Sequence, residues 1–408
     1  RRAAGTVSRF KGLTSSKTAA FCLGSFVDEK FFQAALEGYL LGSFELLDFK
    51  SGEAKRSKNR LSRITFAVED RGRVKDVRTA VERGRIIAEG QLLVRRLAFT
   101  PSSYLTPRML AREARQLARK HKFTCRVLDE KAIAKEKMGG LLGVAKGSAE
   151  PPRFIVLKYR DGRTGQKPIV LAGKGVTFDT GGISLKAPLN MYEMKGDMAG
   201  AAAVLAAFVT AARLKLPLNL VGLIPATENM PSGTATKPGD ILTTRKGLTV
   251  ETINTDAEGR LILADALDYA NKFNPQAVID IATLTGASLY ILGYAGAPIL
   301  GNNNRLLQRV KEASEATAEK VWELPIWDDH REMMKSPIAD LVNSAGRTAG
   351  TIAASAFLEN FVGNWPWVHI DIAYVDLEPK GKPYTPKGPT GFGLRLLIEL
   401  LSHWKKLS

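Results

Sequence analysis

The chain has 408 residues, 45% apolar and 25% charged, which is typical of a folded protein of two or three domains. Its only cysteines, Cys22 and Cys125, exclude a disulfide framework and favour a reducing compartment, so we expect a cytoplasmic location. The formal net charge is +18, and residues 1–120 hold 25 basic and 12 acidic residues. Nucleic acid is one partner that would explain this basic segment, while a solvated face or a contact with another subunit is the alternative.

The N-terminus starts with Arg1-Arg2 and no methionine, and residues 1–17 are basic and contain Ser and Thr but no acid. This composition faintly resembles a transit peptide, and no secretory signal is visible. The longest apolar run, 198–212, is shorter than the roughly 18–20 residues that span a membrane. We therefore expect this run to form a buried helix and expect no membrane partner.

In the first 120 residues, apolar runs alternate with basic turns. Their spacing predicts an amphipathic helix over 31–47, a strand over 64–68 and a long helix over 78–99. A turn at 100–103 precedes a helix that begins at Thr106-Pro107, where proline suits an early helical position. We expect a shortened N-terminal region over 1–85, a linking helix and turn over 86–105, and a larger domain over 106–408.

The larger domain alternates strand-like and helical segments. An Ala-rich helix is predicted over 199–214, and apolar runs suit strands covered on both faces at 154–157, 169–172, 220–224, 277–281 and 368–372. This alternation predicts an α/β fold: a central mixed, mostly parallel sheet flanked by helices, preceded by a shortened N-terminal α/β region. A ligand site is expected beyond the carboxyl ends of the strands.

Several common catalytic sites are missing from the sequence. The four histidines do not occur at zinc-protease spacing, no Gly-x-Ser-x-Gly elbow is present, and segment 143–147 lacks the ending of a phosphate loop. Neither cysteine has the neighbours expected of a nucleophile.

Three stretches with glycines, acids and lysines carry the chemistry instead. The first, 172–186, follows a predicted strand; the second, 194–197, directly precedes the Ala-rich helix; the third, 254–260, lies between a strand-like run and a helix. If the third stretch is extended, its alternate residues Asn254, Asp256, Glu258 and Arg260 share one face.

Two carboxylates so close together repel each other unless a cation lies between them. Carboxylate clusters without histidine suit divalent metals, and a lysine among them pairs as a cation or, if neutral, serves as a ligand. Arg260 lies near a helix start, where an anion is favoured. Surface acids with a helix cap at Asn254 are the alternative for the third stretch alone, whereas the three stretches together favour a metal site.

The segment Asn-Thr-Asp-Ala-Glu-Gly-Arg-Leu at 254–261 resembles the signature of the leucyl aminopeptidase family, the cytosol aminopeptidases with a two-metal site. Gly-Lys-Gly-Val-Thr-Phe-Asp-Thr-Gly-Gly-Ile-Ser at 173–184 is similar to a second family motif. Segments 193–198, 229–233 and 280–286 match in the same order, and the resemblance extends from about residue 30 to 400. It implies that 106–408 is a two-metal aminopeptidase catalytic domain.

The resemblance also implies a role for each site residue. Two divalent ions, Zn or Mn with Mg or Co as alternatives, would be held by Lys174, Asp179, Asp197, Asp256 and Glu258. Among these, Asp179 and Glu258 would bridge the ions and Lys174 would bind as a neutral amine. Lys186 would polarise the scissile carbonyl, and Arg260 would hold a bicarbonate ion as general base. Substrate would contact Met194, Thr283, Leu284 and Gly286.

By the same resemblance, the chain removes an N-terminal residue, Leu or Met preferred, from short peptides, and assembles as a homohexamer with inward-facing active sites. The alternatives are a DNA-binding regulator that uses the basic N-terminal region, and an inactive scaffold. The presence of all seven metal and catalytic residues argues against a scaffold. Three features depart from the family: the N-terminal region is short, Gly196 replaces a larger residue, often Tyr, and Ser103 replaces Asn.

Overall fold

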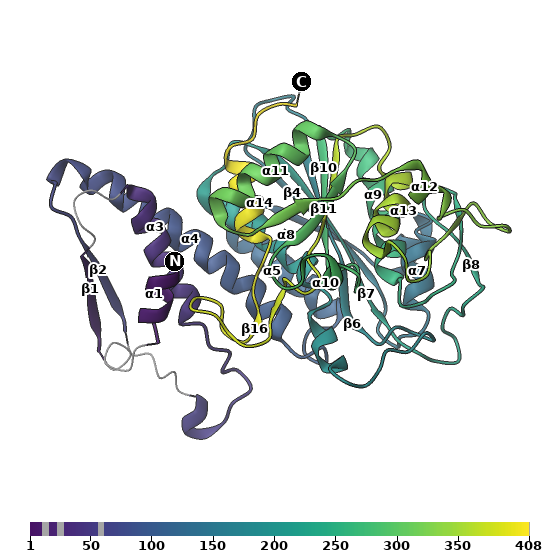
Figure 1. The fold of residues 1–408 in the computed structure, drawn as a ribbon, viewed down its shortest axis with the longest axis horizontal. Coiled ribbons are helices and arrows are strands. Elements are labelled where there is room, and N and C mark those ends of the chain that lie inside the picture. Colours follow the sequence, from purple (N-terminus) through teal and green to yellow (C-terminus); the bar gives the residue numbers. More distant parts are fainter. Residues whose placement is uncertain (10–15, 23–27, 56–60, 408) are drawn as a thin grey trace.

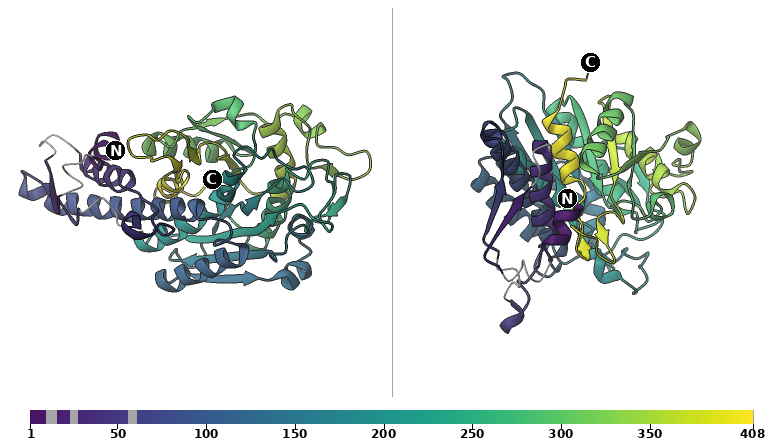
Figure 2. Two further views of the ribbon diagram at one scale, coloured as in Figure 1. Left: turned by 90° about the horizontal axis from the view of Figure 1, so that it is seen from below. Right: turned by 60° about the vertical axis from the view of Figure 1, so that its left-hand side comes forward.

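The computed structural model describes residues 1–9, 16–22, 28–55 and 61–407. A small N-terminal part and a larger α/β part are joined along the long helix α4 (Val74–Phe99), which Figure 1 shows running from one into the other. The two side views of Figure 2 show the N-terminal part projecting beyond one edge of the larger part. The division of the chain at residues 85 and 105 stays a prediction, since α4 is continuous across residue 85.

The N-terminal part consists of short elements, of which α3 packs on α4. They are α1 (Arg2–Val7), β1 (Thr18–Cys22), α3 (Glu29–Gly42), η1 (Gly52–Lys55), β2 (Arg63–Ala67) and η2 (Arg71–Arg73). Strands β1 and β2 pair in parallel, and Asp28 caps α3 by accepting a hydrogen bond from the Lys30 N–H. The helix predicted over 31–47 is confirmed as α3, which begins at Glu29 and ends at Gly42. Part of the basic connection between α3 and β2, residues 56–60, lies outside the described residues.

Arg95 of α4 fastens the N-terminal part to the rest of the molecule. Its guanidinium is fully buried and donates to the carbonyl oxygens of Leu41, Tyr384 and Thr390 at 2.6, 3.0 and 2.8 Å. A buried arginine needs such partners because an unsatisfied charge is costly in the interior. Arg95 thus binds the end of α3 and the C-terminal segment 384–390 to the same helix, α4.

The large sheet has the order β12-β11-β14-β10-β5-β7-β4-β3, with β6 extending alongside β7. Strands β14, β10, β5 and β7 are parallel neighbours. Strand β4 is antiparallel to both β7 and β3, and β11 is antiparallel to β14 but parallel to β12. This is the mixed, mostly parallel sheet that the sequence predicted. Its strands are β3 (Thr124–Leu128), β4 (Arg153–Arg160), β5 (Ile169–Gly173), β6 (Gly175–Asp179), β7 (Asn219–Asn229), β10 (Ala277–Ala282), β11 (Ala297–Gly301), β12 (Val321–Glu323) and β14 (Trp367–Asp371).

Helices cover both faces of this sheet because its central strands are apolar on both sides. One face packs on α4 and on α5 (Pro107–His121), α8 (Ala199–Leu214), α11 (Asn304–Thr317) and α14 (Leu394–Ser402). The other packs on α6 (Glu130–Lys135), α7 (Gly139–Ala145), α9 (Glu258–Ala270) and α13 (Gly350–Val362). The predicted helix after Thr106 begins as expected, because the Thr106 hydroxyl accepts from the Met109 N–H and Pro107 opens α5.

Shorter elements complete the larger part. They are η3 (Met191–Gly196), β8 (Ile241–Thr243), β9 (Thr249–Glu251), η4 (Asn271–Phe273), α10 (Ser288–Leu292), α12 (Asp328–Glu332), β13 (Leu341–Val342), β15 (Leu377–Glu378) and β16 (Gly388–Pro389). The loops that leave the carboxyl ends of β5, β6, β10 and β14 gather at one edge of the sheet. A ligand site is expected at this edge.

One helical stretch of the described chain, Met191–Leu214, is long and apolar enough to cross a membrane, with a mean hydropathy of 1.4. However, 83% of its most apolar window is buried inside the protein. The Ala-rich helix α8 in this stretch is packed between α4 and the sheet, as a core helix is.

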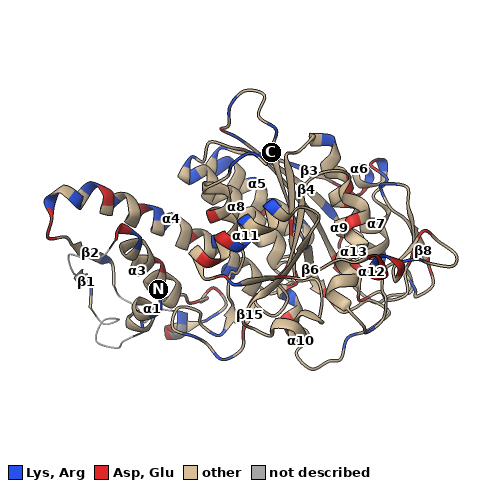
Figure 3. Cartoon of the chain, turned by 45° about the horizontal axis from the view of Figure 1, so that its top comes forward, with Lys and Arg blue, Asp and Glu red and all other residues tan. Residues whose placement is uncertain are grey.

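The cartoon in Figure 3 shows basic and acidic positions interspersed along the chain, including along α4. Arg85 pairs with Glu82 and Glu89 on α4, and Arg73 pairs with Glu29 at 2.7 Å. Arg73 and Arg85 are therefore each paired with acidic residues.

Candidate metal centre

Three carboxylates meet at the carboxyl edge of the sheet. Asp179 ends β6, Asp256 lies in the turn after β9, and Glu258 is the first residue of α9. An oxygen from each lies within 4.8 Å of the other two, and Asp179 and Glu258 are buried. Such a group can hold a metal ion, because carboxylates this close require a positive charge among them.

Lys174 and Asp197 extend this group on one side. Lys174 follows β5, and its Nζ lies 2.7 Å from Glu258 Oε1 and 2.8 Å from Asp197. It also donates to the carbonyl oxygen of Thr283 at 2.9 Å, while the Thr283 hydroxyl donates to Asp197 at 2.7 Å. The predicted pocket residue Thr283 is therefore in direct contact with two predicted metal ligands.

A glycine in the first turn of α9 makes room for Lys174. A Cβ at Gly259 would lie 2.8 Å from the Lys174 Cε and 2.9 Å from a Leu284 methyl group, both too close. A side chain at this position would displace Lys174 or Leu284, so the glycine lets the lysine cross the helix start and reach Glu258 in its observed position. Sequence reasoning noted this glycine within the motif but gave it no role.

Lys186 extends the group on the other side. Its Nζ lies 2.9 Å from Asp179 and forms a short ion pair with Asp256. The Lys186 side chain is 24% exposed, whereas that of Lys174 is 4% exposed. Lys186 is thus the one of these two lysines that a ligand in solvent can reach.

The charges of the group are unbalanced in the protein alone, since four carboxylates face two ammonium groups. Burial raises the pKa of Asp179 and Asp197, and raises that of Asp256 to about 6 with Glu258 contributing. Glu258 differs: burial opposes ionisation, but Lys174 and Lys186 lower its pKa. Its Oε2 is buried without a hydrogen-bond partner among the described residues. This oxygen and the excess negative charge fit divalent cations.

Arg260 lies in the first turn of the same helix, among the acids. It is 9% exposed, and its Nη1 donates to the Asn343 carbonyl at 2.5 Å, while its Nε has no partner in the described chain. Burial lowers the pKa of Arg260 to about 10, although Glu258, Asp371 and Asp256 favour the charged form. A buried guanidinium with a free N–H can bind a small anion.

The idea that 254–260 is extended, with alternate residues on one face, is wrong. Residues 254–257 form a turn and Glu258 already belongs to α9, so Asp256 and Glu258 converge through the turn and helix start. Asn254 is likewise not the helix cap, which is Ala257. Its side chain instead accepts from the Asp256 N–H at 2.9 Å and supports the turn.

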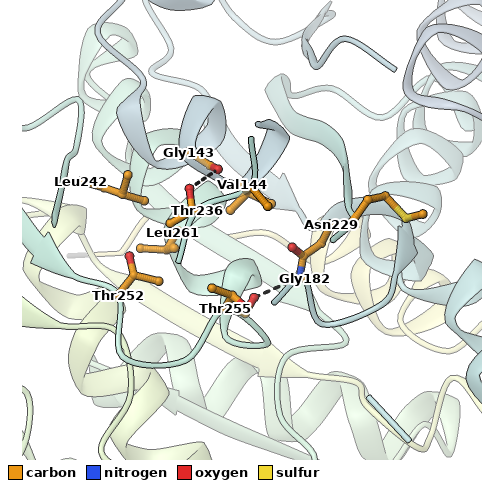
Figure 4. Close-up of a pocket in the computed structure, with 11 residues that line it drawn as sticks. Gly143, Val144, Gly182, Asn229, Thr236, Leu242, Thr252, Thr255 and Leu261 are labelled. Carbon is orange, nitrogen blue, oxygen red and sulfur yellow. Dashed lines mark hydrogen bonds between the residues drawn. The ribbon is translucent and has the colours of Figure 1, made fainter. Parts of the chain in front are cut away.

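Asn229, at the end of β7, holds the metal-binding loops together. Its amide donates to Asp179 Oδ1 at 2.9 Å and to the Thr255 carbonyl at 3.0 Å. A small cavity beside this contact is lined by Asn229, Thr255 and Gly182, as Figure 4 shows. Gly182 has a φ of +66°, and a Cβ there would lie 2.8 Å from the Asn229 Oδ1. The sequence placed Asn229 in a matching motif but did not reveal this positioning role.

Asp371, at the end of β14, fixes the loop that carries the other predicted substrate residues. It accepts from the Leu284 N–H at 3.0 Å and from the Thr285 hydroxyl at 2.6 Å. Gly286 follows in this loop, and Met194 lies in η3, where its carbonyl accepts from the Asp197 N–H at 3.3 Å. Met194 is thus hydrogen-bonded to the metal-binding residue Asp197, and Leu284 is next in sequence to Thr283, which contacts Lys174 and Asp197. Sequence reasoning missed Asp371 altogether.

Comparisons with known proteins agree with this geometry. Residues 92–398 match the family model described as the cytosol aminopeptidase family, catalytic domain. A probable cytosol aminopeptidase of Syntrophotalea carbinolica is 49% identical over 369 residues, covering 90% of this chain and 74% of that protein. One from Solibacter usitatus is 46% identical over 99% of this chain and 83% of its own length. The solved structure of the bottromycin maturation enzyme BotP in complex with Mn is 36% identical, with a TM-score of 0.90, over 98% of this chain and 86% of that one.

Proposed function

Because the chain belongs to the cytosol aminopeptidase family and is a metal-dependent aminopeptidase, we propose that it removes the N-terminal residue of short peptides with two divalent ions. Lys174, Asp179, Asp197, Asp256 and Glu258 would hold these ions. The observation that carries the proposal is the group of four carboxylates with a buried, unpartnered Glu258 oxygen. The four positive charges of two divalent ions would balance the four negative charges of these carboxylates.

When bound, a pair of such ions provides a nucleophilic water near neutral pH and polarises the peptide carbonyl. Lys174 must lose a proton to act as a ligand. Burial alone would lower its pKa, but Asp197, Glu258 and Asp179 outweigh burial and raise it, so the lysine is charged in the protein alone. Metal binding should therefore release this proton.

Lys186 would stabilise the oxyanion of the tetrahedral intermediate. Its ammonium is held between Asp179 and Asp256 and is open to solvent, so its charge is in place before the substrate reacts. Preorganised charge of this kind is usually the largest electrostatic contribution to such a reaction. Arg260, with its free Nε, would hold bicarbonate, which would supply a general base beside the metal-binding residues.

The pocket beside the centre would be lined by Met194, Thr283 and Gly286, with the Leu284 backbone holding the peptide. The Met194 side chain favours Leu and Met at the first position, although a methylene group contributes only about 1–3 kcal/mol to such discrimination. Zn and Mn are the proposed ions, with Mg and Co as alternatives, and the Mn in BotP supports Mn. We further propose a cytoplasmic location and a homohexamer that limits substrates to short peptides.

The DNA-binding alternative receives no support from the described residues. Its basis was the basic N-terminal region, where Arg73 and Arg85 are paired with acids instead of forming a continuous basic face. No other observation on the described chain favours it.

Hydrolysis of Leu-p-nitroanilide in the presence of Mn, Zn or Co tests the proposal. Glu258→Gln should abolish turnover, because the amide cannot supply the second anionic oxygen, while Glu332→Gln on the exposed helix α12 should leave turnover unchanged. Unaltered activity of Glu258→Gln would defeat the two-ion assignment. Absence of turnover in the wild-type protein with all three ions would defeat the function.

A further inference from the structure

We infer that Asp376, in the turn after β14, adds a carboxylate to the pocket beside the metal centre, so that the enzyme also removes N-terminal Lys and Arg. The inference rests on the proposed function, because a peptide whose α-amine binds at the metal centre places its first side chain next to the metal-binding residues. It would broaden the preference for Leu and Met.

Gly196 creates space next to the metal-binding residue Asp197. A Cβ added to Gly196 would meet nothing closer than the Ala98 carbonyl oxygen at 3.7 Å and Asp376 Oδ2 at 3.8 Å. By contrast, a Cβ at Gly200, four residues further on, would lie 2.1 Å from a backbone oxygen. Gly196 therefore leaves room beside Asp197, and the Asp376 carboxylate borders that room.

A second glycine faces the same turn. A Cβ at Gly286 would have only the Tyr374 hydroxyl within 4 Å, at 3.8 Å. Lys186 is near enough to this phenol to oppose the rise in its pKa that burial and Tyr294 cause. The glycines of two loops beside the metal centre thus each face a side chain from residues 374–376. In the inferred pocket, residues 374–376 provide one wall.

Backbone hydrogen bonds fix the turn that carries this carboxylate. Tyr374 has a φ of +69°, a left-handed conformation that is uncommon for a bulky aromatic residue and that recurs at functional sites. The Asp376 N–H donates to the Ile372 carbonyl at 3.0 Å, and the Asp376 carbonyl accepts from the Thr390 N–H at 2.7 Å. The backbone of Asp376 is therefore held in place before a ligand arrives.

The described chain offers no cation to this carboxylate. None of the described lysines and arginines forms an ion pair with Asp376, and the neighbouring charged groups, Asp371 and Glu193, are acids. Lys195, close in sequence, places its Nζ over the Phe99 ring at 4.9 Å. Burial and the two acids raise the pKa of Asp376 to about 7. An entering cation would reverse this effect, since an opposite charge favours the ionised form.

Lysine and arginine side chains suit such a pocket because their stems are apolar and only their ends are charged. The stem can pack where a Leu or Met side chain packs, near Met194, while the ammonium or guanidinium group reaches Asp376. An uncharged chain of equal length gains nothing from the carboxylate.

The test compares Lys-, Arg-, Leu- and norleucine-p-nitroanilide as substrates, because norleucine has the lysine stem without its ammonium group. We expect the wild-type enzyme to cleave all four. In Asp376→Asn and Asp376→Met, the ratio of kcat/KM for Lys to that for norleucine should fall at least about tenfold. The ratio is measured on one enzyme, so a general loss of folded protein cancels. Asp328→Asn, whose side chain is 94% exposed, is the matched control and should keep the wild-type ratio.

The outcomes separate this inference from the proposed function. Cleavage of Leu without cleavage of Lys or Arg, or an unchanged Lys-to-norleucine ratio in both Asp376 variants, would overturn the inference and leave the aminopeptidase function intact. Failure to cleave any of the four with Mn, Zn or Co would overturn both.

Discussion

Replacing Asp371 with alanine should loosen the substrate loop and destabilise the fold. The carboxylate is fully buried at the end of β14 and accepts hydrogen bonds from the Leu284 N–H and the Thr285 hydroxyl, at 3.0 and 2.6 Å. Two longer bonds come from the Thr285 and Ala373 N–H groups. The variant removes the carboxylate acceptor of all four donors, of which the Thr285 hydroxyl keeps its contact with the Thr351 hydroxyl.

The expected loss follows from the two shortest bonds. Each hydrogen bond to a charged acceptor contributes about 1.5–3 kcal/mol, so Asp371→Ala should lower the free energy of unfolding by about 3–6 kcal/mol. The loop also carries the Thr283 carbonyl that binds Lys174, so kcat/KM should fall at least about tenfold. Urea denaturation measures the loss of stability. Hydrolysis of Leu-p-nitroanilide, measured without denaturant and divided by the concentration of folded enzyme, gives the change in kcat/KM.

Asp371→Asn is the matched variant. Its remaining oxygen can still accept from the Leu284 N–H, and the Thr285 hydroxyl, which also contacts the Thr351 hydroxyl at 2.7 Å, can turn to accept from the new amide. The asparagine variant should therefore lose less than half as much stability as the alanine variant. If Asp371→Ala stays within about 0.5 kcal/mol of the wild type and keeps its kcat/KM, the assigned positioning role is wrong.

Three further changes test other parts of the structure. Asn229→Ala removes an amide that orients a metal-binding carboxylate, so a metal titration should show about 10–100-fold weaker binding, and unchanged affinity would contradict this role. Gly200→Ala should destabilise despite the better helix propensity of alanine, because its Cβ would lie 2.1 Å from the Ile281 oxygen; a thermal midpoint at or above that of the wild type would refute the clash. Burial lowers the pKa of His369, but Asp280 outweighs burial and raises this pKa above 6.5. The stability that the charged His369 adds is therefore complete below pH 6.5 and is lost as the pH rises through the folded-state pKa. Urea unfolding of wild type and His369→Asn at pH 6 and 8.5 should show this advantage shrink, and an advantage that grows with pH would contradict the sign.

Local sequence signals predicted the strands and helices that have strong patterns. The Ala-rich run became α8 at nearly the expected bounds, and Thr106-Pro107 marked the start of α5, because a cap and an apolar pattern act over a few residues. Short strands such as β12 and β13 lack such a pattern and depend on pairing with distant segments, so the sequence did not reveal them.

In the candidate site, too, residues within local sequence motifs could be predicted, whereas residues that depend on distant contacts could not. The resemblance brought out Lys174, Asp179 and Glu258, which share motifs with glycines, and the structure brings these three together. Asp371 ends a buried strand and Asp376 lies in the turn after it, and neither belongs to a motif that the sequence reveals. Their roles depend on how the end of β14 lies against loops about 90 and 180 residues earlier, which only the fold specifies.

The number of divalent ions bound per chain tests the central proposal most directly. Purified protein equilibrated with Mn or Zn and then freed of excess ion should contain two ions per chain by elemental analysis, and activity towards Leu-p-nitroanilide should rise with the second ion. Glu258→Gln should retain no more than one. A fully active wild-type protein with fewer than two ions, or a Glu258→Gln variant that still holds two, would contradict a two-ion centre that Glu258 helps to hold.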